Sequence, residues 1–195
     1  MWLWRELYGL ATLMSVDLDF SKSYFELFGL PEAFEIDTAQ LAERYRALQA
    51  ALHPDRFASA GEHERRLSVQ GASWINEAYE TLKEPLSRAR YLLALKGLDF
   101  DADKDTASDS EFLMQQIELR EQLEEVDSKP DPFAALDEIS RTIRDWNLEL
   151  QEKFAAAYAA DELGLARQTV LKMQFFNRLF DELRRKEEHL EETLM

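Results

Sequence analysis

Apolar side chains recur along this chain every three or four residues, the spacing that is typical of amphipathic helices. The clearest stripe in the first half consists of four residues: Leu41, Tyr45, Leu48 and Leu52. Asp37 precedes it as an expected N-cap, with Gln40 in capping-box register, since a short polar side chain can accept hydrogen bonds from free backbone N–H groups. Pro54 disfavours helical backbone at the residue before it, so this helix should stop at His53.

Further helices flank this stripe on both sides. Residues 23–29 form a short apolar helical turn ahead of it. A longer helix is expected over residues 62–83, and a shorter one over residues 86–96 should close at Gly97, since glycine is the usual residue just after a helix. Residues 98–109 are acidic and small, which is typical of a linker.

The second half predicts three helices with short connections. Ser108 and Glu111 form a capping box ahead of an apolar run, and that helix should last until Pro130. Asp131 and Pro132 then supply the N-cap and the first residue of the next helix. A final helix runs almost to the C-terminus, with an apolar stripe of Phe176, Leu179, Leu183 and Leu190. Short connections favour an antiparallel three-helix bundle.

Composition favours helices over strands. Six glycines and five prolines among 195 residues leave little sequence for the many turns of an all-β fold. The absence of cysteine excludes disulfides, thiolate zinc sites and cysteine nucleophiles, and it suits a reducing cytoplasm. No stretch approaches the roughly 20 apolar residues that a membrane helix needs. We therefore expect an all-α protein without a membrane span.

The net charge of −16 is unevenly distributed. Residues 1–98 hold 11 Lys and Arg against 14 Asp and Glu, whereas residues 99–195 hold 12 against 25. A surface this acidic would repel a phosphate backbone, so no binding to nucleic acid is expected. The change in charge near residue 99 also indicates a domain boundary.

A His-Pro-Asp tripeptide follows the first long helix, and it sits in a recognisable setting. It is preceded by Tyr45-Arg46-Ala47-Leu48 and followed, some twenty residues later, by an Asn-x-Ala-Tyr-x-x-Leu run over residues 76–82. The tripeptide between these two helices resembles a J domain, in which an antiparallel helical hairpin carries the HPD loop at its tip. An isolated tripeptide would instead be read as an ordinary turn that ends a helix.

The resemblance implies that the loop and the basic face of the preceding helix dock on a DnaK-type ATPase and stimulate it. Proline stiffens the loop, and the aspartate offers a carboxylate that a partner arginine could hold with two charge-assisted hydrogen bonds. The histidine can donate or accept a hydrogen bond. Glu43 makes this face less basic than in many J domains, so delivery by the client should matter more. The expected chaperone-binding residues are His53, Pro54, Asp55, Arg44, Arg46 and Arg56.

The rest of the chain resembles HscB-type co-chaperones, the J proteins of iron–sulfur cluster assembly. Arg88-Ala89, Tyr91-Leu92-Leu93, Gly97 and the run from Phe112 to Glu121 carry this resemblance, which covers nearly everything from Tyr24 onward. It implies an L-shaped molecule of four parts: an N-terminal extension over residues 1–20, a J domain over residues 21–97, a linker over residues 98–109 and a client-binding three-helix domain over residues 110–195. Met14 is an alternative start, and the apolar opening lacks the basic residues of a signal peptide.

The helix after the linker has two apolar faces. One arc faces the expected bundle core and comprises Phe112, Leu119, Leu123 and Val126. Leu113, Met114 and Ile117 fall roughly opposite, and three glutamates continue that outer stripe. An apolar patch that runs into acid suggests a partner-binding surface, where methionine can adapt to the partner. The alternative is that Leu113 and Ile117 pack on the J domain while the glutamates are merely solvated.

In HscB-type proteins the matching residues bind the iron–sulfur scaffold protein. Here they are Leu113, Met114, Ile117, Glu118, Glu121, Glu125 and, on the last helix, Phe175. The resemblance implies that the second domain captures the scaffold and that the J domain brings it to an HscA-like chaperone of the DnaK type, whose ATP turnover then rises. No chemical step, metal or cofactor of its own is expected for the protein.

Four alternatives to this function draw on the same residues. An enzyme using His53 and Asp55 would have them in water without a pocket, and a di-iron bundle would need a glutamate three residues before a histidine, which the sequence lacks. A J protein for a different client remains the main alternative, and it predicts scaffold binding that is indifferent to Leu113, Met114 and Ile117. A coiled-coil adaptor would elongate and dimerise on gel filtration, whereas we expect a compact monomer or weak dimer.

Overall fold

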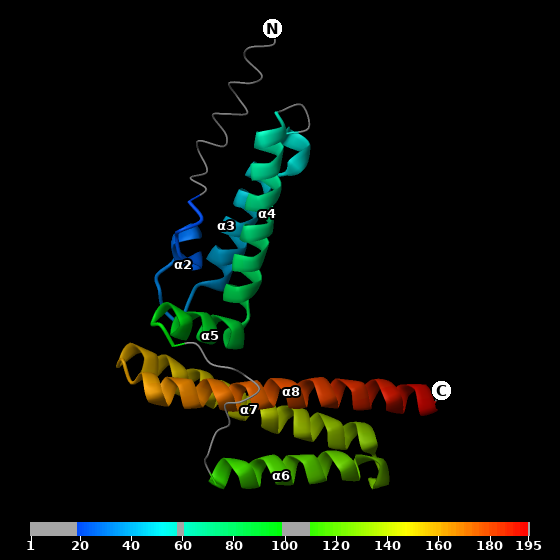
Figure 1. Ribbon diagram of the computed structural model, residues 1–195. Helices are drawn as coiled ribbons and strands as arrows, with labels where there is room; N and C mark the ends of the chain where they lie inside the picture. Colours follow the sequence, from blue (N-terminus) through cyan, green and yellow to red (C-terminus); the bar gives the residue numbers. More distant parts are fainter. Residues whose placement is uncertain (1–18, 58–60, 99–109, 195) are drawn as a thin grey trace. The chain divides into compact units, whose positions relative to one another are not determined.

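The computed structural model describes residues 19–57, 61–98 and 110–194, which form helices and turns and, within those ranges, no strand. The all-α prediction is confirmed. By internal contacts the chain divides into two compact units, Met1–Leu92 and Leu93–Met195 (Figure 1). Residues 1–18 of the predicted extension, most of the linker and the predicted Ser108 cap lie outside the described residues, so the predicted domain boundaries stay predictions.

The first unit is built on a helical hairpin. Its elements are α2 (Tyr24–Leu27), α3 (Thr38–Ala51), the short 3₁₀ helix η1 (Pro54–Phe57), α4 (Glu62–Lys83) and most of α5 (Pro85–Leu95), within which the division between the units falls. α3 and α4 lie side by side and run in opposite directions, with η1 joining them at one end (Figure 1). The predicted hairpin and the predicted helix over residues 62–83 are confirmed.

Local signals fix both ends of α3. The Asp37 carboxylate accepts hydrogen bonds from the backbone N–H groups of Ala39 (2.9 Å) and Gln40 (3.0 Å), as predicted for an N-cap. The helix was predicted to stop at His53, but it ends two residues earlier at Ala51, with Leu52 as its C-cap, just ahead of the backbone that Pro54 restricts. The sequence signals therefore set the length of α3 and the position of the loop that follows it.

We expect Asp37→Ala to lower the free energy of unfolding by about 1 kcal/mol, because it removes an N-cap acceptor and leaves two N–H groups of α3 without it. Denaturant titration followed by circular dichroism would measure the change. Glu43→Ala is the matched control, because Glu43 is exposed on the same helix and caps nothing. Equal losses in the two variants would contradict a capping role for Asp37.

The hairpin is held together by an apolar seam with a polar edge. Leu41 and Leu52 of the predicted stripe are fully buried, whereas Tyr45 is half-buried. The Tyr45 ring stacks on Tyr79 with the ring centroids 4.0 Å apart, and its hydroxyl donates to Oδ1 of Asn76 (3.0 Å). The stacked rings and this hydrogen bond together fix the register of α3 against α4.

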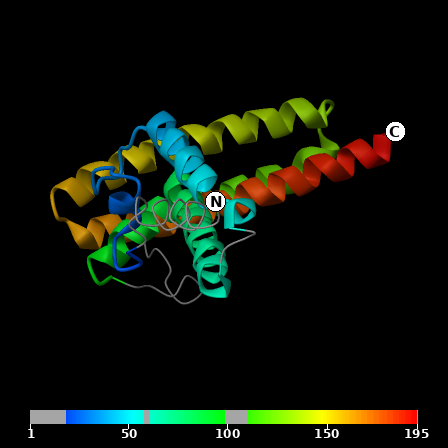
Figure 2. The same ribbon diagram turned by 90° about the horizontal axis from the view of Figure 1, so that it is seen from above.

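The second unit is the predicted three-helix bundle. It consists of α6 (Ser110–Glu124), the 3₁₀ helix η2 (Glu125–Ser128), α7 (Pro132–Ala159) and α8 (Leu163–Leu194). α7 and α8 lie side by side along much of their length in both views (Figures 1 and 2). Asp131 caps α7 by accepting from the backbone N–H of Ala134 (3.0 Å), as predicted.

The end of α6 differs from the prediction. The sequence predicted a helix until Pro130, but α6 ends at Glu124 and the chain continues as the tighter η2. In η2 the Ser128 hydroxyl donates to the Glu125 carbonyl (2.7 Å), which ties up that acceptor locally. Val126 is fully buried in the bundle core, on the inner arc where helical periodicity had placed it. The 3₁₀ turn therefore tightens the last turn of the helix, as is frequent at helix C-termini, and keeps its core residue inside.

The bundle core is continuous and rich in aromatic rings. Its buried members are Phe112, Leu119, Val126, Leu136, Ile139, Ile143, Phe176, Leu179, Leu183 and Leu190, which include the predicted stripe of the last helix. The Phe112 ring meets Phe176 edge-on at 5.7 Å, and Trp146 lies 5.8 Å from Phe176. No helix of the described chain has an apolar stretch suited to crossing a bilayer.

Candidate functional site

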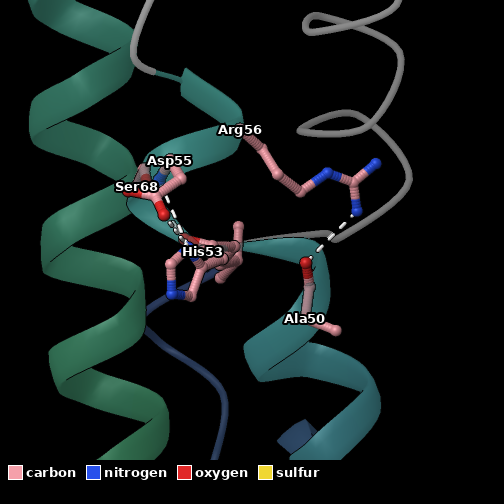
Figure 3. Close-up of polar contacts among 6 residues, drawn as sticks. Ala50, His53, Asp55, Arg56 and Ser68 are labelled. Atoms are coloured by element: carbon pink, nitrogen blue, oxygen red, sulfur yellow. Dashed lines mark hydrogen bonds and ion pairs between the residues drawn. The ribbon is translucent and has the colours of Figure 1, made fainter.

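The loop between α3 and α4 presents His53 and Asp55 to solvent. The His53 ring accepts a hydrogen bond at Nδ1 from the Asp55 backbone N–H (3.3 Å), and Nδ1 lies 3.6 Å from Asp55 Oδ2 (Figure 3). The side chains are 55% and 91% exposed. The histidine side chain therefore stabilises the backbone of its own loop, while the aspartate carboxylate remains open to a partner.

The loop is anchored beneath by two buried side chains. Phe57, at the end of η1, is 1% exposed and fixes the loop in the core of the first unit. The buried Ser68 hydroxyl on α4 donates to the Leu52 carbonyl at the end of α3 (2.8 Å; Figure 3). This bond ties the start of the loop to α4. Sequence reasoning missed Ser68, because a serine within a helix gives no signal of its partner 16 residues away.

Ser68→Ala should reduce the free energy of unfolding by about 1–2 kcal/mol, since it leaves the buried Leu52 carbonyl without its donor. Chemical denaturation would test this against Ser73→Ala, which removes an exposed hydroxyl from the same helix. If the two variants unfold at the same denaturant concentration, the Ser68 bond does not stabilise the loop end.

The three predicted chaperone-binding arginines do not form one cluster. Arg56 lies at the loop, where its guanidinium donates to the Ala50 carbonyl (3.2 Å; Figure 3). Arg44 lies nine residues before His53, about 13 Å along a helix axis, and its guanidinium rests against Gly29. Arg46 is exposed on α3. Of the six predicted residues, the structure joins His53 and Asp55 by direct contact and places Arg56 beside them.

Gly29 explains why Arg44 can rest there. Its backbone is left-handed (φ +58°), and a Cβ added to it would lie 2.9 Å from Nη1 of Arg44. Glycine is therefore favoured at this position by its backbone, and a Cβ there would only displace the mobile end of the Arg44 side chain. The contact places the Arg44 guanidinium at the turn that follows α2.

α6 is two-faced, as the sequence predicted. Phe112 and Leu119 are buried in the bundle core. On the other face Leu113, Met114 and Ile117 are 48%, 68% and 52% exposed. Glu118, Glu121 and Glu125 are exposed as well and follow them along the helix. We call these six exposed residues the α6 surface. Its role as a binding surface stays a prediction.

Phe175, the seventh predicted scaffold-binding residue, joins this surface only in part. It is half-buried on α8 and meets Phe112 edge-on, with ring centroids 5.5 Å apart. The Arg120 guanidinium lies 5.6 Å from the centre of the same ring, a contact that sequence reasoning missed. Phe175 therefore links α6 to α8 and presents only part of its ring to a partner.

Known proteins resemble this chain over most of its length. A family model described as the HSCB C-terminal oligomerisation domain matches residues 108–184. The co-chaperone protein HscB homolog of Aeromonas hydrophila is 46% identical over 171 residues, which cover 88% of this chain and 99% of that protein. The homolog of the same name from Shewanella halifaxensis is 45% identical, over 86% of this chain and 98% of its own.

Solved structures agree with the sequence relatives. The chaperone HscB from Vibrio cholerae superposes with a TM-score of 0.79 at 41% identity, over 87% of this chain and 99% of its own. The human co-chaperone protein HscB superposes with a TM-score of 0.80 at 31% identity, over 87% and 84% of the two chains. This chain belongs to the HscB family of co-chaperones.

Proposed function

We propose that this co-chaperone captures an iron–sulfur cluster scaffold protein on its second unit and delivers it to an HscA-like chaperone of the DnaK type. The first unit then stimulates the ATPase of that chaperone through the exposed HPD loop. The chaperone closes on the scaffold and favours release of the cluster to acceptor proteins, so maturation of iron–sulfur proteins is promoted. The observation that carries the proposal is the exposed apolar part of the α6 surface.

The α6 surface has the make-up of a protein interface. In a three-helix bundle the outward side of a helix is normally polar, yet Leu113, Met114 and Ile117 are each about half exposed or more. An apolar centre with a polar rim is typical of protein interfaces. The neighbouring glutamates suit basic groups on the scaffold, which would orient it on the helix.

The HPD loop has the features of a docking element for an arginine of the chaperone. Its carboxylate is open to solvent, while Phe57 and Ser68 hold the loop from below. A preorganised loop loses little conformational entropy on binding. Two charge-assisted hydrogen bonds from one arginine would then favour the chaperone state that accepts them, and this differential binding is what can shift the ATPase cycle.

Two sites on one chain give the delivery step its physical basis. When the scaffold is held on the second unit, its encounter with the chaperone becomes intramolecular within the complex and depends on an effective concentration. The weakly basic face of α3, with Glu43 beside Arg44, supports this dependence on the client. Action in the cytoplasm, expected from the cysteine-free sequence, stays a prediction, as does a monomeric or weakly dimeric state.

Titration calorimetry of the purified protein into the scaffold protein tests the client. We expect saturable binding, since the α6 surface offers an apolar centre that stays hydrated without a partner. A scaffold that produces no binding heat, together with normal stimulation of the ATPase, would overturn the client assignment. In that case a J-domain co-chaperone for a different client is the function to pursue.

A further inference from the structure

A groove of about 400 Å³ follows the seam between α6 and α7. Its walls include buried Leu119 and Ile139 together with half-buried Trp146. The rim is polar and comes from both helices: Glu118 and Gln122 of α6, and Glu138 and Thr142 of α7. The groove therefore combines an apolar floor with hydrogen-bonding and charged groups at its edge.

The pattern of α6 explains why this seam is not filled. The polar α6 residues that border it are Glu118 and Gln122, and Gln115, which borders a neighbouring hollow, shares their side of the helix. Long polar side chains at these positions favour solvent over the core, so they do not close the seam. Trp146 also lines a second hollow of about 260 Å³ bordered by Gln115, so the indole ring contributes to both hollows.

The charge of the groove is negative. Neither the Glu118 nor the Glu138 carboxylate makes an ion pair with another residue in the described part of the chain. Lys129 is the one cation among the residues that line the groove, and its Nζ forms an ion pair with Oε2 of Glu125 at 2.9 Å. Two carboxylates over an apolar floor suit a basic side chain that is accompanied by an apolar one.

We propose that this groove seats an extended segment of the scaffold protein, with an apolar side chain against Trp146 and a lysine or arginine between Glu118 and Glu138. The inference rests on the proposed function, because Glu118 belongs both to the α6 surface and to the rim of the groove. A scaffold seated on Met114 and Ile117 therefore already borders it. The groove extends that interface across α6 onto α7.

Size and charge select this occupant. A volume of about 400 Å³ lies at the small end of the range for ligand pockets, which fits a few side chains of a segment and not a whole helix. A second copy of this chain is disfavoured, since its net charge of −16 would bring more negative charge to an acidic groove. The basic segment therefore comes from the partner.

A pair of charge reversals on adjacent residues tests the proposal. Glu138→Lys places a cation on the rim of the groove, whereas Asp137→Lys makes the same change of charge on the other flank of α7, beside Ser140 and Arg144. Titration into the scaffold should show roughly tenfold weaker binding for Glu138→Lys, because like charges would face each other there. Binding of Asp137→Lys should stay within about twofold of the wild type, since its charge lies away from the interface.

A second readout reports on the floor of the groove. In protein labelled with 5-fluorotryptophan, the ¹⁹F resonance of Trp146, assigned with Trp146→Phe, should shift when unlabelled scaffold is added. An unmoved Trp146 resonance, with equal affinities for the two lysine variants, would overturn the groove proposal. If alanines at Leu113, Met114 and Ile117 still weaken binding in that case, the proposed function stands without the groove. If the wild type does not bind the scaffold, both proposals fail.

Discussion

Asp55→Asn is expected to lower stimulation of the chaperone ATPase by at least about 30-fold at equal concentration. The Asp55 side chain is 91% exposed, and its carboxylate lies near His53 Nδ1 but has no role in the core. Asparagine keeps the size and removes the charge that a partner arginine would bind. Loss of one partner from a hydrogen-bonded charge pair in an interface costs about 2–5 kcal/mol. The lower figure corresponds to about 30-fold weaker binding to the chaperone, and stimulation below saturation falls with it.

The same variant should keep its fold and its client. Its circular dichroism spectrum and its affinity for the scaffold should match those of the wild type, because the side chain contacts no core residue. Asp137→Asn serves as the control for the loss of one exposed carboxylate from the second unit. Full stimulation by Asp55→Asn would place the chaperone contact on another surface and contradict the role assigned to the HPD loop.

Simultaneous replacement of Leu113, Met114 and Ile117 by alanine should weaken scaffold binding by about 2–4 kcal/mol, the range expected when several anchors of one interface are truncated. The three residues are 48%, 68% and 52% exposed, so their truncation removes little packing from the bundle core. Alanine has the highest helix propensity, so α6 itself should remain intact. Titration calorimetry measures the loss, and circular dichroism checks that helicity is unchanged.

Exposed apolar residues elsewhere provide the control for this variant. Leu148 on α7 is 57% exposed and Val69 on α4 is 56% exposed. Alanine at these two positions should leave scaffold affinity within about 0.5 kcal/mol of the wild type, as is usual for surface substitutions. If the triple variant binds as tightly as these controls, the scaffold uses another surface and the α6 assignment is wrong.

Local signals explain why so much of the fold could be predicted. Asp37 and Asp131 cap the helices that the sequence predicted for them, and α3 ends at Ala51, two residues ahead of the stop at His53 predicted from Pro54. Each of these signals acts within a few residues and needs no knowledge of the tertiary structure. The two faces of α6 could also be predicted, because helical periodicity alone places Phe112 and Met114 on different faces.

Features that depend on the approach of two helices could not be predicted. The hydrogen bond from Ser68 to the Leu52 carbonyl joins α4 to the end of α3, and the sequence around Ser68 does not indicate which acceptor it has. The position of the Arg44 guanidinium against Gly29 also depends on how the hairpin packs. The three arginines that were predicted to bind the chaperone together therefore lie apart. The groove beside Trp146 exists only because α6 and α7 leave their seam open.

Delivery of the scaffold is tested most directly by the steady-state ATP turnover of the HscA-like chaperone, measured with this protein alone, with the scaffold alone and with both. We expect the two together to raise turnover well above the sum of their separate effects, because one chain holds the client and presents the HPD loop. The triple alanine variant should lose this excess and keep the stimulation seen without scaffold. Turnover that is merely additive for the wild type would contradict delivery of the scaffold by this protein.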